Sequence, residues 1–363
     1  MFGLFKKKKK NTIDSTNLQL TIKEVVKETD DAVSIVFEEP ESGPIQYQPG
    51  QYLTLIDTID GKKVRRAYSL SSSPALQENP TVTVKRVENG LMSNHVNTNF
   101  EAGKTIEVMA PMGSFVIEIK PEIKKHLYLF GGGSGITPLM SITKTVLKTE
   151  AESKVTLLYA NRDEKSIIFK SKLEELQSEF GERLEVIHFL ENAPADWSGY
   201  TGYMTYDAIK ESLDKTKDET FSTVHYMTCG PEPMMNIVTE TLESLSINMD
   251  HFHKESFTPT NTTEPAAASD ASSDQTVKIN LDGETHEVLV PAGTPILEAG
   301  LDAGIDMPYS CQSGLCTACR AKVVSGEVEN ENADGLTDGE KAQGYVLLCV
   351  GHAASEGIEV EVG

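Results

Sequence analysis

The sequence predicts a multidomain protein that combines an all-β unit with α/β units, and three observations support this fold class. Residues 18–120 contain many short segments rich in Val, Ile and Thr, which favour strands. Strand-like and helix-like segments alternate between residues 121 and 258, which is typical of a parallel sheet covered by helices. A third unit, residues 275–363, follows a segment with almost nothing to bury.

These patterns divide the chain into five segments. We expect a flexible basic N-terminus over residues 1–14, an antiparallel β-barrel over residues 15–120 and a parallel α/β domain over residues 121–258. A flexible linker over residues 259–274 then leads to a small final domain over residues 275–363.

In the first unit, the expected strands are residues 18–25, 33–37, 52–56, 81–87 and 115–119. Turn sequences such as Pro-Gly, Ser-Ser-Pro and Pro-Met-Gly separate them. Many short strands at this spacing favour a closed barrel.

Residues that suit a dinucleotide with a flat ring lie inside this unit. Arg66 is able to pair with a pyrophosphate, Tyr68 to pack on an aromatic face, and Ser69 to offer a hydrogen bond. Arg-x-Tyr-Ser also occurs in ordinary strands, so the motif alone leaves both interpretations open. Farther along, Gly90-Leu-Met92-Ser93 predicts a glycine turn that opens a helix. Such a helix N-terminus favours phosphate, although a capped helix needs no ligand.

A glycine-rich turn follows the strand-like residues 126–130. It reads Gly-Gly-Gly-Ser-Gly-Ile-Thr-Pro over residues 131–138 and leads into a helix with an apolar face. Strand, glycine turn and helix form a phosphate-binding unit, so Gly133, Thr137 and Pro138 are candidate nucleotide-binding residues. The spacing is G-x-G-x-x-P, and proline is tolerated in the first helical turn because its missing N–H needs no partner there.

Strands and helices then alternate. The expected strands are residues 155–159, 184–190 and 224–228, and the expected helices are residues 171–180, 206–213 and 231–245.

Arg162 and Asp163 follow the first of these strands. An arginine there suits the 2′-phosphate of NADPH and an acid suits the ribose of NADH, so the pair favours NADPH but leaves NADH open. Cys229 and Gly230 follow the last strand, at the sheet edge where ligands bind; a buried inert thiol is the alternative.

Four cysteines define the final unit. Cys311, Cys316 and Cys319 have the spacing C-x4-C-x2-C, and Cys349 follows thirty residues later. This is the ligand spacing of a plant-type [2Fe–2S] cluster, because two bridged irons need four converging thiolates. A four-cysteine zinc site usually has two separated C-x2-C pairs, and disulfides need an oxidising compartment, which nothing in the sequence indicates.

The charge limits the kinds of partner. The formal net charge is −22, which argues against nucleic acid because phosphate binding needs a basic surface. Residues 259–363 contain 18 acidic and 4 basic side chains, which indicates either steering of a basic partner surface or solubility.

No stretch of the sequence approaches the length of a membrane span. The N-terminal Met-Phe-Gly-Leu-Phe and the following Lys6–Lys10 suit weak peripheral contact with an anionic membrane, or a solvated tail.

Taken together, these motifs resemble the ferredoxin–NADP⁺ reductase family, in the branch with a C-terminal plant-type ferredoxin domain. The resemblance covers residues 15–363 and is closest to the reductase components of phenylacetyl-CoA mono-oxygenase (epoxidase) and related hydroxylase and desaturase systems. It implies an FAD-binding β-barrel, a nucleotide-binding α/β domain and a β-grasp ferredoxin-like domain. The cofactors that it implies are FAD, a [2Fe–2S] cluster, and NADPH or NADH as electron donor.

The resemblance also implies roles for single residues. Arg66, Tyr68, Ser69, Gly90 and Ser93 match the family's FAD motifs, with Ser69 near the reactive flavin nitrogen. Residues 131–138 match the nicotinamide nucleotide turn, and Cys229 to Pro231 match the C-G-P motif near the site of hydride transfer. Phe257 matches the aromatic residue that covers the flavin, with Glu255 beside it, and phenylalanine there is a departure from the tyrosine of relatives. Ser69, Cys229 and Glu255 are the candidate catalytic residues.

We therefore expect an NAD(P)H-dependent reductase that passes electrons through FAD and the cluster to an oxygenase, hydroxylase or desaturase component. Two alternatives remain: a subunit that carries electrons from a dehydrogenase in the reverse direction, and a non-enzymatic redox sensor. The complete nicotinamide turn argues against the sensor. We expect the protein to be cytoplasmic, with the N-terminus either free or resting on the inner face of the membrane.

Overall fold

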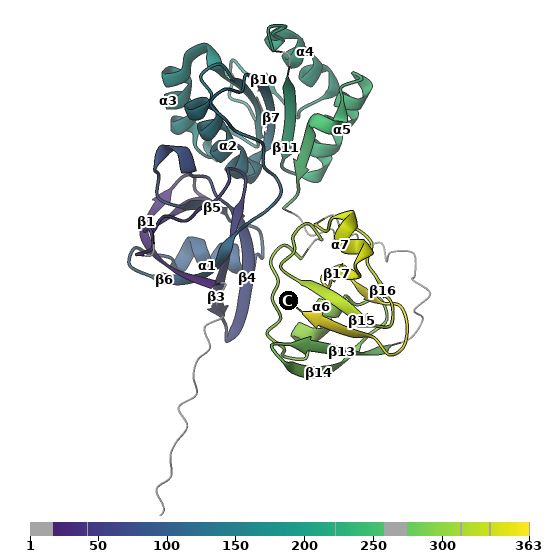
Figure 1. Ribbon diagram of the computed structural model, residues 1–363. Coiled ribbons are helices and arrows are strands. Elements are labelled where there is room, and N and C mark those ends of the chain that lie inside the picture. The colour runs from purple at the N-terminus through teal and green to yellow at the C-terminus, as the bar shows by residue number, and fades with distance from the viewer. Residues whose placement is uncertain are drawn as a thin grey trace, which may run out of the picture.

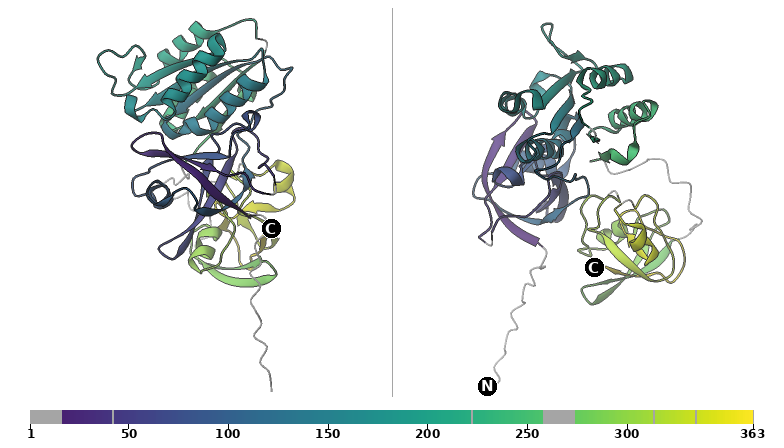
Figure 2. Two further views of the ribbon diagram at one scale, coloured as in Figure 1. Left: turned by 90° about the vertical axis from the view of Figure 1, so that its left-hand side faces the viewer. Right: turned by 45° about the horizontal axis from the view of Figure 1, so that its top comes forward.

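The computed structural model describes residues 17–41, 43–221, 223–257, 274–312, 314–333 and 335–362 (Figure 1). Three large sheets organise these residues and follow one another along the chain, and a two-stranded sheet accompanies the third. Figure 2 shows the α/β domain packed on one end of the barrel, with the C-terminal domain against a different side of the barrel. The expected N-terminal tail and nearly all of the expected linker lie outside the described residues.

The first sheet is antiparallel and has the order β4-β3-β6-β1-β2-β5. Its strands are β1 (Asn17–Lys27), β2 (Ala32–Phe37), β3 (Tyr52–Ile59), β4 (Lys62–Ser69), β5 (Thr81–Lys85) and β6 (Thr105–Met112). The sheet curls until its two edges meet at a bridge between Leu70 and Val82, so the predicted barrel is confirmed and closes at one end. A short helix, α1 (Leu91–Asn99), follows β5 as predicted and covers the barrel core.

One predicted strand is wrong. Residues 115–119 form no strand in the structure, although their alternating apolar pattern is real. Phe115 and Ile117 are buried among the core residues of the next domain, so they alternate because they pack there and not because they pair with a neighbouring strand. Strands β4 and β6 were not among the predicted strands.

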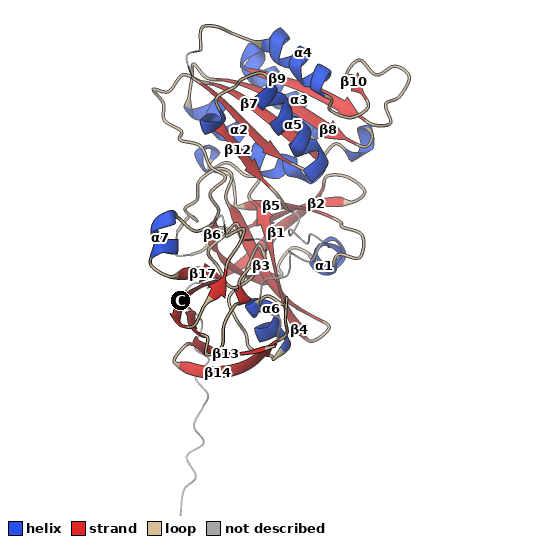
Figure 3. Ribbon diagram, turned by 90° about the vertical axis from the view of Figure 1, so that its right-hand side faces the viewer, coloured by secondary structure: helices blue, strands red, loops and turns tan. Residues whose placement is uncertain are grey.

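The second sheet is parallel and has the order β10-β9-β8-β7-β11-β12, as the alternating pattern predicted. Its strands are β7 (His126–Gly132), β8 (Lys154–Asn161), β9 (Leu184–Leu190), β10 (Tyr200–Thr201), β11 (Val224–Cys229) and β12 (Phe252–Glu255). Its longer helices are α2 (Ile136–Thr149), α3 (Lys170–Phe180), α4 (Tyr206–Thr216) and α5 (Glu232–Ser244). Figure 1 shows α2 and α3 on one side of the strands and α4 and α5 on the other, and Figure 3 shows this domain above the two smaller β domains.

Both faces of this sheet are buried because its strands are apolar at successive positions. In β7, Leu127 and Leu129 pack with α2 and α3, whereas Tyr128 and Phe130 pack with α4 and α5. Such near-continuous apolar strands are what a doubly covered parallel sheet requires. The arrangement places the ends of β7, β8 and β11 at one carboxyl edge, where a ligand site is expected.

The third sheet has the order β14-β13-β19-β15-β17 and curves around helix α6 (Ile296–Asp302), which confirms the predicted β-grasp domain. Its strands are β13 (Gln275–Leu281), β14 (Glu284–Val290), β15 (Arg320–Ser325), β17 (Tyr345–Leu347) and β19 (Glu359–Val362). Strands β16 (Val328–Glu329) and β18 (His352–Ala353) pair separately, and α7 (Asp338–Ala342) precedes β17. Asp282 and Gly283 have φ of 52° and 81°, which fits the predicted tight hairpin turn. Within the described ranges, no helix is long and apolar enough to cross a bilayer.

Candidate functional site

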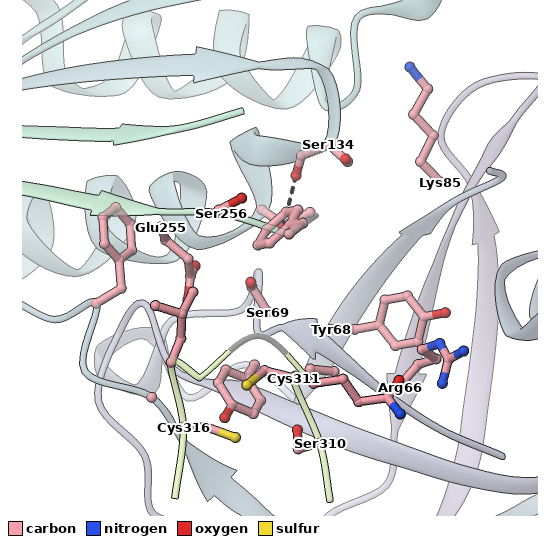
Figure 4. A pocket seen from close by; sticks show the side chains of 18 of the residues that line it. Arg66, Tyr68, Ser69, Lys85, Ser134, Glu255, Ser256, Ser310, Cys311 and Cys316 are labelled. Carbon is pink, nitrogen blue, oxygen red and sulfur yellow. Dashed lines mark hydrogen bonds between the residues drawn. The ribbon is translucent and has the colours of Figure 1, made fainter. Parts of the chain in front are cut away.

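One cleft of about 740 Å³ lies where the three sheets meet. Its wall is made of β3, β4 and α1 of the barrel, the glycine turn and β12 of the α/β domain, and the cysteine loop of the C-terminal domain. Figure 4 shows labelled side chains from all three domains around it, including Ser69, Glu255 and Cys311. The predicted site residues that line the cleft are Arg66, Tyr68, Ser69, Gly90, Met92, Ser93, Thr137, Glu255, Phe257, Cys311 and Cys316.

Strand β4 supplies Arg66, Tyr68 and Ser69. Arg66 is exposed, donates to the neighbouring Arg65 carbonyl at 2.7 Å, and forms no ion pair within the described part of the chain. Its guanidinium is therefore available to an anionic ligand in the cleft. Burial raises the pKa of the Tyr68 phenol, which stays protonated at neutral pH, and Ser69 is buried at the inner end of the strand.

The turn at the start of α1 is held by its own side chains. Gly90 is the residue before the helix, and no side chain caps the helix there. Ser93 Oγ accepts a hydrogen bond from the Val87 backbone N–H at 3.1 Å, which fixes the turn. Met92 is nearly inaccessible and packs in the barrel core at the cleft wall. The open end of α1 leaves backbone N–H groups for a phosphate.

The glycine turn after β7 passes very close to the end of β11. A Cβ atom added to Gly135 would lie 2.0 Å from the Cys229 carbonyl oxygen, so only glycine fits there. Gly133 has φ of 52°, and the one atom near its missing Cβ is Lys85 Nζ at 3.7 Å. Thr137 donates to the Ser134 carbonyl at 3.0 Å, and Pro138 is the third residue of α2. The turn therefore presents open backbone on its cleft side.

Cys229 ends β11 and stands between Gly131 of β7 and Glu255 of β12 in the strand register. Its side chain is completely buried, and burial, with a smaller contribution from the Glu255 charge, raises the thiol pKa well above its usual value. Cys229 is therefore at the predicted sheet edge but behind the cleft wall, as a protonated thiol. Gly230 packs against the Gly132 backbone and leaves no room for a side chain.

Glu255 ends β12 in the cleft. Its Oε2 atom is buried and has no hydrogen-bond partner among the described residues. Burial raises the pKa of this carboxyl to about 8, so a large protonated fraction exists at neutral pH. Such an orphaned carboxyl indicates a ligand group that is supplied when the cleft is occupied. Phe257, two residues farther on, is 46% exposed at the mouth.

Arg162 is the one predicted nucleotide residue that is highly exposed outside the cleft. It follows β8 at the carboxyl edge, and its side chain is 63% exposed. Its Nε donates to Asp163 at 3.2 Å, while Asp163 also accepts from the Ser166 N–H. Asp163 is thus occupied in capping a short 3₁₀ helix, and the remaining guanidinium N–H groups face solvent.

The four cysteine side chains come together in two contacting pairs. Cys316 contacts Cys311, Cys319 contacts Cys349, and Cys349 also contacts Cys311. Within the described ranges, no three His, Cys, Asp or Glu side chains converge on a single metal ion. Two linked pairs of thiols instead fit a binuclear cluster, in which each iron takes two cysteine ligands.

The loop that carries three of these cysteines is tightly folded. Gly314 has φ of 75°, and a Cβ atom there would lie 2.1 Å from the Asn332 carbonyl oxygen. Gly335 donates to the Gly314 carbonyl at 2.7 Å, which closes the loop against the segment after β16. The residues present therefore fit a cluster that must be wrapped by small residues.

The structure also places in the cleft residues that are not among the predicted site residues. They are Tyr52 on β3, Lys85 at the end of β5, Ser134 in the glycine turn, and Ser310 beside Cys311. Tyr52 and Ser310 stand 258 positions apart along the chain, so no local pattern relates them. Ser134 lies inside the predicted glycine turn, whereas Lys85 comes close to that turn only because the two domains pack together.

The C-terminal domain is attached to the barrel beside the cleft by polar contacts. Thr54 Oγ1 and Ser310 Oγ are 2.6 Å apart, and both are buried. Arg65 pairs with Asp306 at 2.6 Å, and its guanidinium lies 5.2 Å from the centre of the Tyr309 ring. Lys63 adds a second ion pair to Asp306 at 3.2 Å.

Comparisons with known proteins agree with this organisation. The sequence matches the oxidoreductase FAD-binding domain over residues 18–117, the oxidoreductase NAD-binding domain over residues 129–240 and the 2Fe-2S iron-sulfur cluster binding domain over residues 279–354. The presence of FAD, a [2Fe–2S] cluster and a pyridine nucleotide donor, predicted from the motifs, is confirmed.

Relatives match along nearly the whole chain. The ferredoxin reductase component of 3-ketosteroid-9-alpha-monooxygenase from Rhodococcus rhodochrous is 37% identical, over 96% of this chain and 97% of its own. A component of 1,2-phenylacetyl-CoA epoxidase from Escherichia coli is 34% identical, over 91% of this chain and 93% of its own.

A solved structure also matches over the full length. It is described as phthalate dioxygenase reductase, a modular structure for electron transfer from pyridine nucleotides to [2Fe–2S]. It superimposes with a TM-score of 0.61 and 26% identity, over 96% of this chain and 98% of its own. The chain therefore belongs to the ferredoxin–NADP⁺ reductase family, in its branch of oxygenase reductase components with a C-terminal [2Fe–2S] domain.

Proposed function

We propose that this protein takes electrons from NADPH and delivers them singly, through FAD and a [2Fe–2S] cluster, to the terminal component of an oxygenase. The observation that carries the proposal is the single cleft that joins candidate FAD, nicotinamide and cluster residues from three domains. Bound FAD would supply the exchange between two-electron and one-electron transfer, which a nicotinamide alone does not provide.

The barrel would hold the FAD. Arg66, which has no ion-pair partner among the described residues, would bind the pyrophosphate, together with the N-terminus of α1 at Gly90 and Ser93. Tyr68 would pack on the flat ring, and the buried Ser69 would donate a hydrogen bond to its reactive nitrogen. Met92 would support this wall from the core, and Phe257 would cover the ring from the opposite side.

The α/β domain would hold the nicotinamide nucleotide. The open backbone at Gly133, with Thr137 and Pro138 at the start of α2, would receive its phosphates. Arg162 would pair with the 2′-phosphate of NADPH through the guanidinium N–H groups that its contact with Asp163 leaves unused. Cys229 and Gly230 would shape the floor beneath the nicotinamide, and the protonated Glu255 would donate a hydrogen bond beside it.

Cys311, Cys316, Cys319 and Cys349 would ligate the cluster, in the pairs that contact one another. The boundaries that we propose for the domains are 15–120, 121–258 and 275–363. Each of the first two encloses one sheet, and the third encloses the five-stranded sheet and the two-stranded sheet of β16 and β18.

The acceptor that we propose is an oxygenase component, because the relatives named above are reductase components of oxygenases. Their names cover a steroid, an aromatic acyl-CoA and, for a 30% identical relative from Pseudomonas aeruginosa, glycine betaine. These substrates differ so much in chemistry that the names indicate no particular substrate for this chain. We propose a cytoplasmic location, with membrane contact through the N-terminus as a second proposal that concerns residues outside the described ranges.

The proposal is tested by anaerobic rapid mixing of the reconstituted protein with NADPH. We expect flavin bleaching first and cluster reduction second, followed by steady reduction of cytochrome c. A redox sensor would not turn over cytochrome c, and a reverse-direction subunit would form NADPH from a reduced partner faster than it consumes it. Either result would contradict the proposal.

The choice of NADPH is tested with Arg162→Ala. We expect kcat/KM for NADPH to fall roughly tenfold to a hundredfold, as for a lost charged hydrogen bond, while kcat/KM for NADH stays unchanged. Lys165→Ala, which removes a nearby charge three residues away, is the matched control. An equal fall in kcat/KM for NADPH and NADH would show that Arg162 does not bind the 2′-phosphate.

A further inference from the structure

The hydroxyl group of Tyr52 has no function in the site as described above. Tyr52 begins β3, is 7% exposed, and lines the cleft between the barrel and the cysteine loop. Its oxygen is buried and makes no hydrogen bond of normal geometry with any described residue. Buried hydroxyl groups rarely lack a partner, because the lost hydration is then not replaced.

Two side chains of the C-terminal domain lie beside this hydroxyl, Ser310 and Cys316, with Cys311 farther away. Figure 4 shows Ser310, Cys311 and Cys316 together at this wall of the cleft. Ser310 Oγ is already paired with Thr54 Oγ1 at 2.6 Å. A cysteine thiol is a weak acceptor, whereas a metal-bound thiolate carries negative charge and accepts strongly. The Cys316 sulfur is therefore the acceptor that becomes strong when iron is bound.

The tyrosine ring is held in place by the strands around it. Gly113, with φ of 122°, passes so close that an added Cβ atom would lie 3.2 Å from Cδ1 and Cε1 of the ring. In the strand register Tyr52 stands opposite Ser69, the residue proposed to contact the flavin. Tyr52 thus connects the flavin wall of the cleft with a cluster ligand.

We propose that the Tyr52 hydroxyl donates a hydrogen bond to the iron-bound Cys316 sulfur, and that this bond makes the cluster easier to reduce only while the C-terminal domain is docked. The inference rests on the cluster ligands assigned above. A donor aimed at a ligand sulfur stabilises the extra negative charge of the reduced cluster, and so raises its reduction potential.

The donor belongs to the barrel and the acceptor to the C-terminal domain, so docking and reduction are linked. Docking favours electron arrival from the flavin, and by reciprocity reduction favours docking by the same factor. A cluster that has left the barrel loses the donor and becomes the stronger reductant, which suits delivery to an acceptor. The contacts that hold the docked arrangement are the Arg65–Asp306 ion pair and the Thr54–Ser310 hydrogen bond.

The first test is Tyr52→Phe in the full-length protein with FAD and cluster bound. At a fixed redox poise we expect the ratio of reduced to oxidised cluster to fall roughly tenfold, as for a lost hydrogen bond to a charged group. This equals a fall of about 59 mV in a one-electron potential. The ratio is measured from the electron paramagnetic resonance signal of the reduced cluster. Tyr47→Phe, which removes a hydroxyl bonded to Ser72 at 2.7 Å elsewhere in the barrel, should leave the ratio unchanged.

The second test is Arg65→Met, which keeps Tyr52 but weakens docking. We expect its cluster potential to fall in the same direction, and the double variant with Tyr52→Phe to fall no farther than the lower of the two single variants. A wild-type potential in either single variant, or fully additive shifts, would overturn the proposal. A wild-type protein that binds no cluster would contradict the proposed function instead, so the two failures are distinguishable.

Discussion

The barrel meets its two neighbours in opposite ways. Its joint with the α/β domain is mostly apolar and continuous with a hydrophobic core, whereas its joint with the C-terminal domain is made mainly of ion pairs and hydroxyl contacts. The first joint would carry a hydride between two bound cofactors, and the second would carry single electrons. This contrast indicates that one joint is built to stay closed and the other is able to open.

The apolar joint is built from residues that follow the barrel. Phe115 and Ile117 are buried among the core residues that α2 contributes to the α/β domain. Gly50 allows close approach, because a Cβ atom there would lie 2.0 Å from the Phe115 carbonyl oxygen. The polar groups across this joint are paired: Ser141 donates to the Ser72 carbonyl at 2.6 Å, and Ser73 and Thr145 are 2.8 Å apart. One ion pair also crosses it, between the largely buried Lys144 and Glu78. Such an interface resembles a domain interior.

Among the described residues, the C-terminal domain shares no hydrophobic cluster with the barrel. The core residues of the C-terminal domain all lie between residues 277 and 362, and those of the barrel between residues 20 and 108. Asp306, which receives both ion pairs, has a side chain that is 58% exposed. Interfaces of this polar kind permit relative domain motion by default.

The largest effect should come from disrupting the apolar joint with Phe115→Ala. Removing a buried aromatic ring leaves a cavity and should lower the free energy of unfolding by about 3–5 kcal/mol. Urea unfolding followed by the fluorescence of Trp197, the single tryptophan, measures it. Tyr203→Ala, which truncates a 70% exposed aromatic residue, should change stability by no more than about 0.5 kcal/mol. A similar small change for Phe115→Ala would mean that the joint is not a core.

One carboxyl group in each neighbouring domain distinguishes the two sides of the barrel further. The pKa of Glu255 in the α/β domain is raised, whereas the pKa of Asp306 in the C-terminal domain is lowered. Burial raises the pKa of Glu255 from 4.5 in the unfolded chain to about 8 in the folded protein. Between pH 4.5 and pH 8 the folded state therefore binds more protons than the unfolded state, and each rise in pH favours unfolding. Wild-type stability should therefore fall as pH rises through this window, by at most about 1.4 kcal/mol per pH unit from this group. The Glu255→Gln variant should lack that component. Parallel curves for both proteins in urea unfolding between pH 5 and 8 would contradict this assignment.

Asp306 should behave in the opposite way. Burial alone would raise its pKa, but hydrogen bonds and charges from Arg65 and Lys63 hold the pKa below 3.8. Its contribution is therefore constant above about pH 4 and is lost only as pH falls through its lowered folded pKa. Neutral pH should leave the polar joint closed.

A smaller effect should follow when the polar joint is weakened with Asp306→Asn. Arg65 is buried while the C-terminal domain is docked, but it regains solvent when that domain undocks. The loss of Asp306 should therefore weaken docking, while the unfolding of each domain should hardly change. The rate of cluster reduction after flavin reduction should fall, by up to about tenfold for each 1.4 kcal/mol of lost docking energy. Stopped-flow absorbance measures both steps. Asp302→Asn removes the same charge from the same domain and should leave the rate unchanged; equal slowing in both variants would indicate a general charge effect.

Of these changes, a rise in ionic strength should have the smallest effect on the rates of flavin reduction and cluster reduction. Raising the ionic strength from about 0.1 M to about 1 M shortens the Debye length from about 10 Å to about 3 Å. We expect cluster reduction to slow only a few-fold, while flavin reduction at saturating NADPH stays constant. The apolar joint is built on buried side chains, and its ion pair, Lys144–Glu78, is largely buried and therefore weakly screened. If salt slowed flavin reduction as strongly as cluster reduction, the contrast between the joints would be lost.

Much of the site could be predicted because most of its residues belong to short motifs that are local in the sequence. The spacing of Cys311, Cys316 and Cys319 is fixed by one loop wrapping one cluster, and the glycine turn at residues 131–138 is fixed by one strand entering one helix. The alternation at residues 115–119 correctly indicates burial but does not identify the partner. A strand that pairs and a connection that packs present the same alternation, so sequence alone does not separate them.

Local sequence thus specified the three folds, the cofactors and the ligands that stand close together along the chain. Packing of the whole chain was needed to show which of these ligands meet, that Cys229 lies behind the cleft wall, and that Arg162 remains at the exposed sheet edge. It also set the position of the Tyr52 hydroxyl beside a sulfur 264 residues away. The physical reason is range: turns, helices and ligand loops are governed by neighbours in sequence, whereas burial and contacts between domains depend on packing across the whole chain.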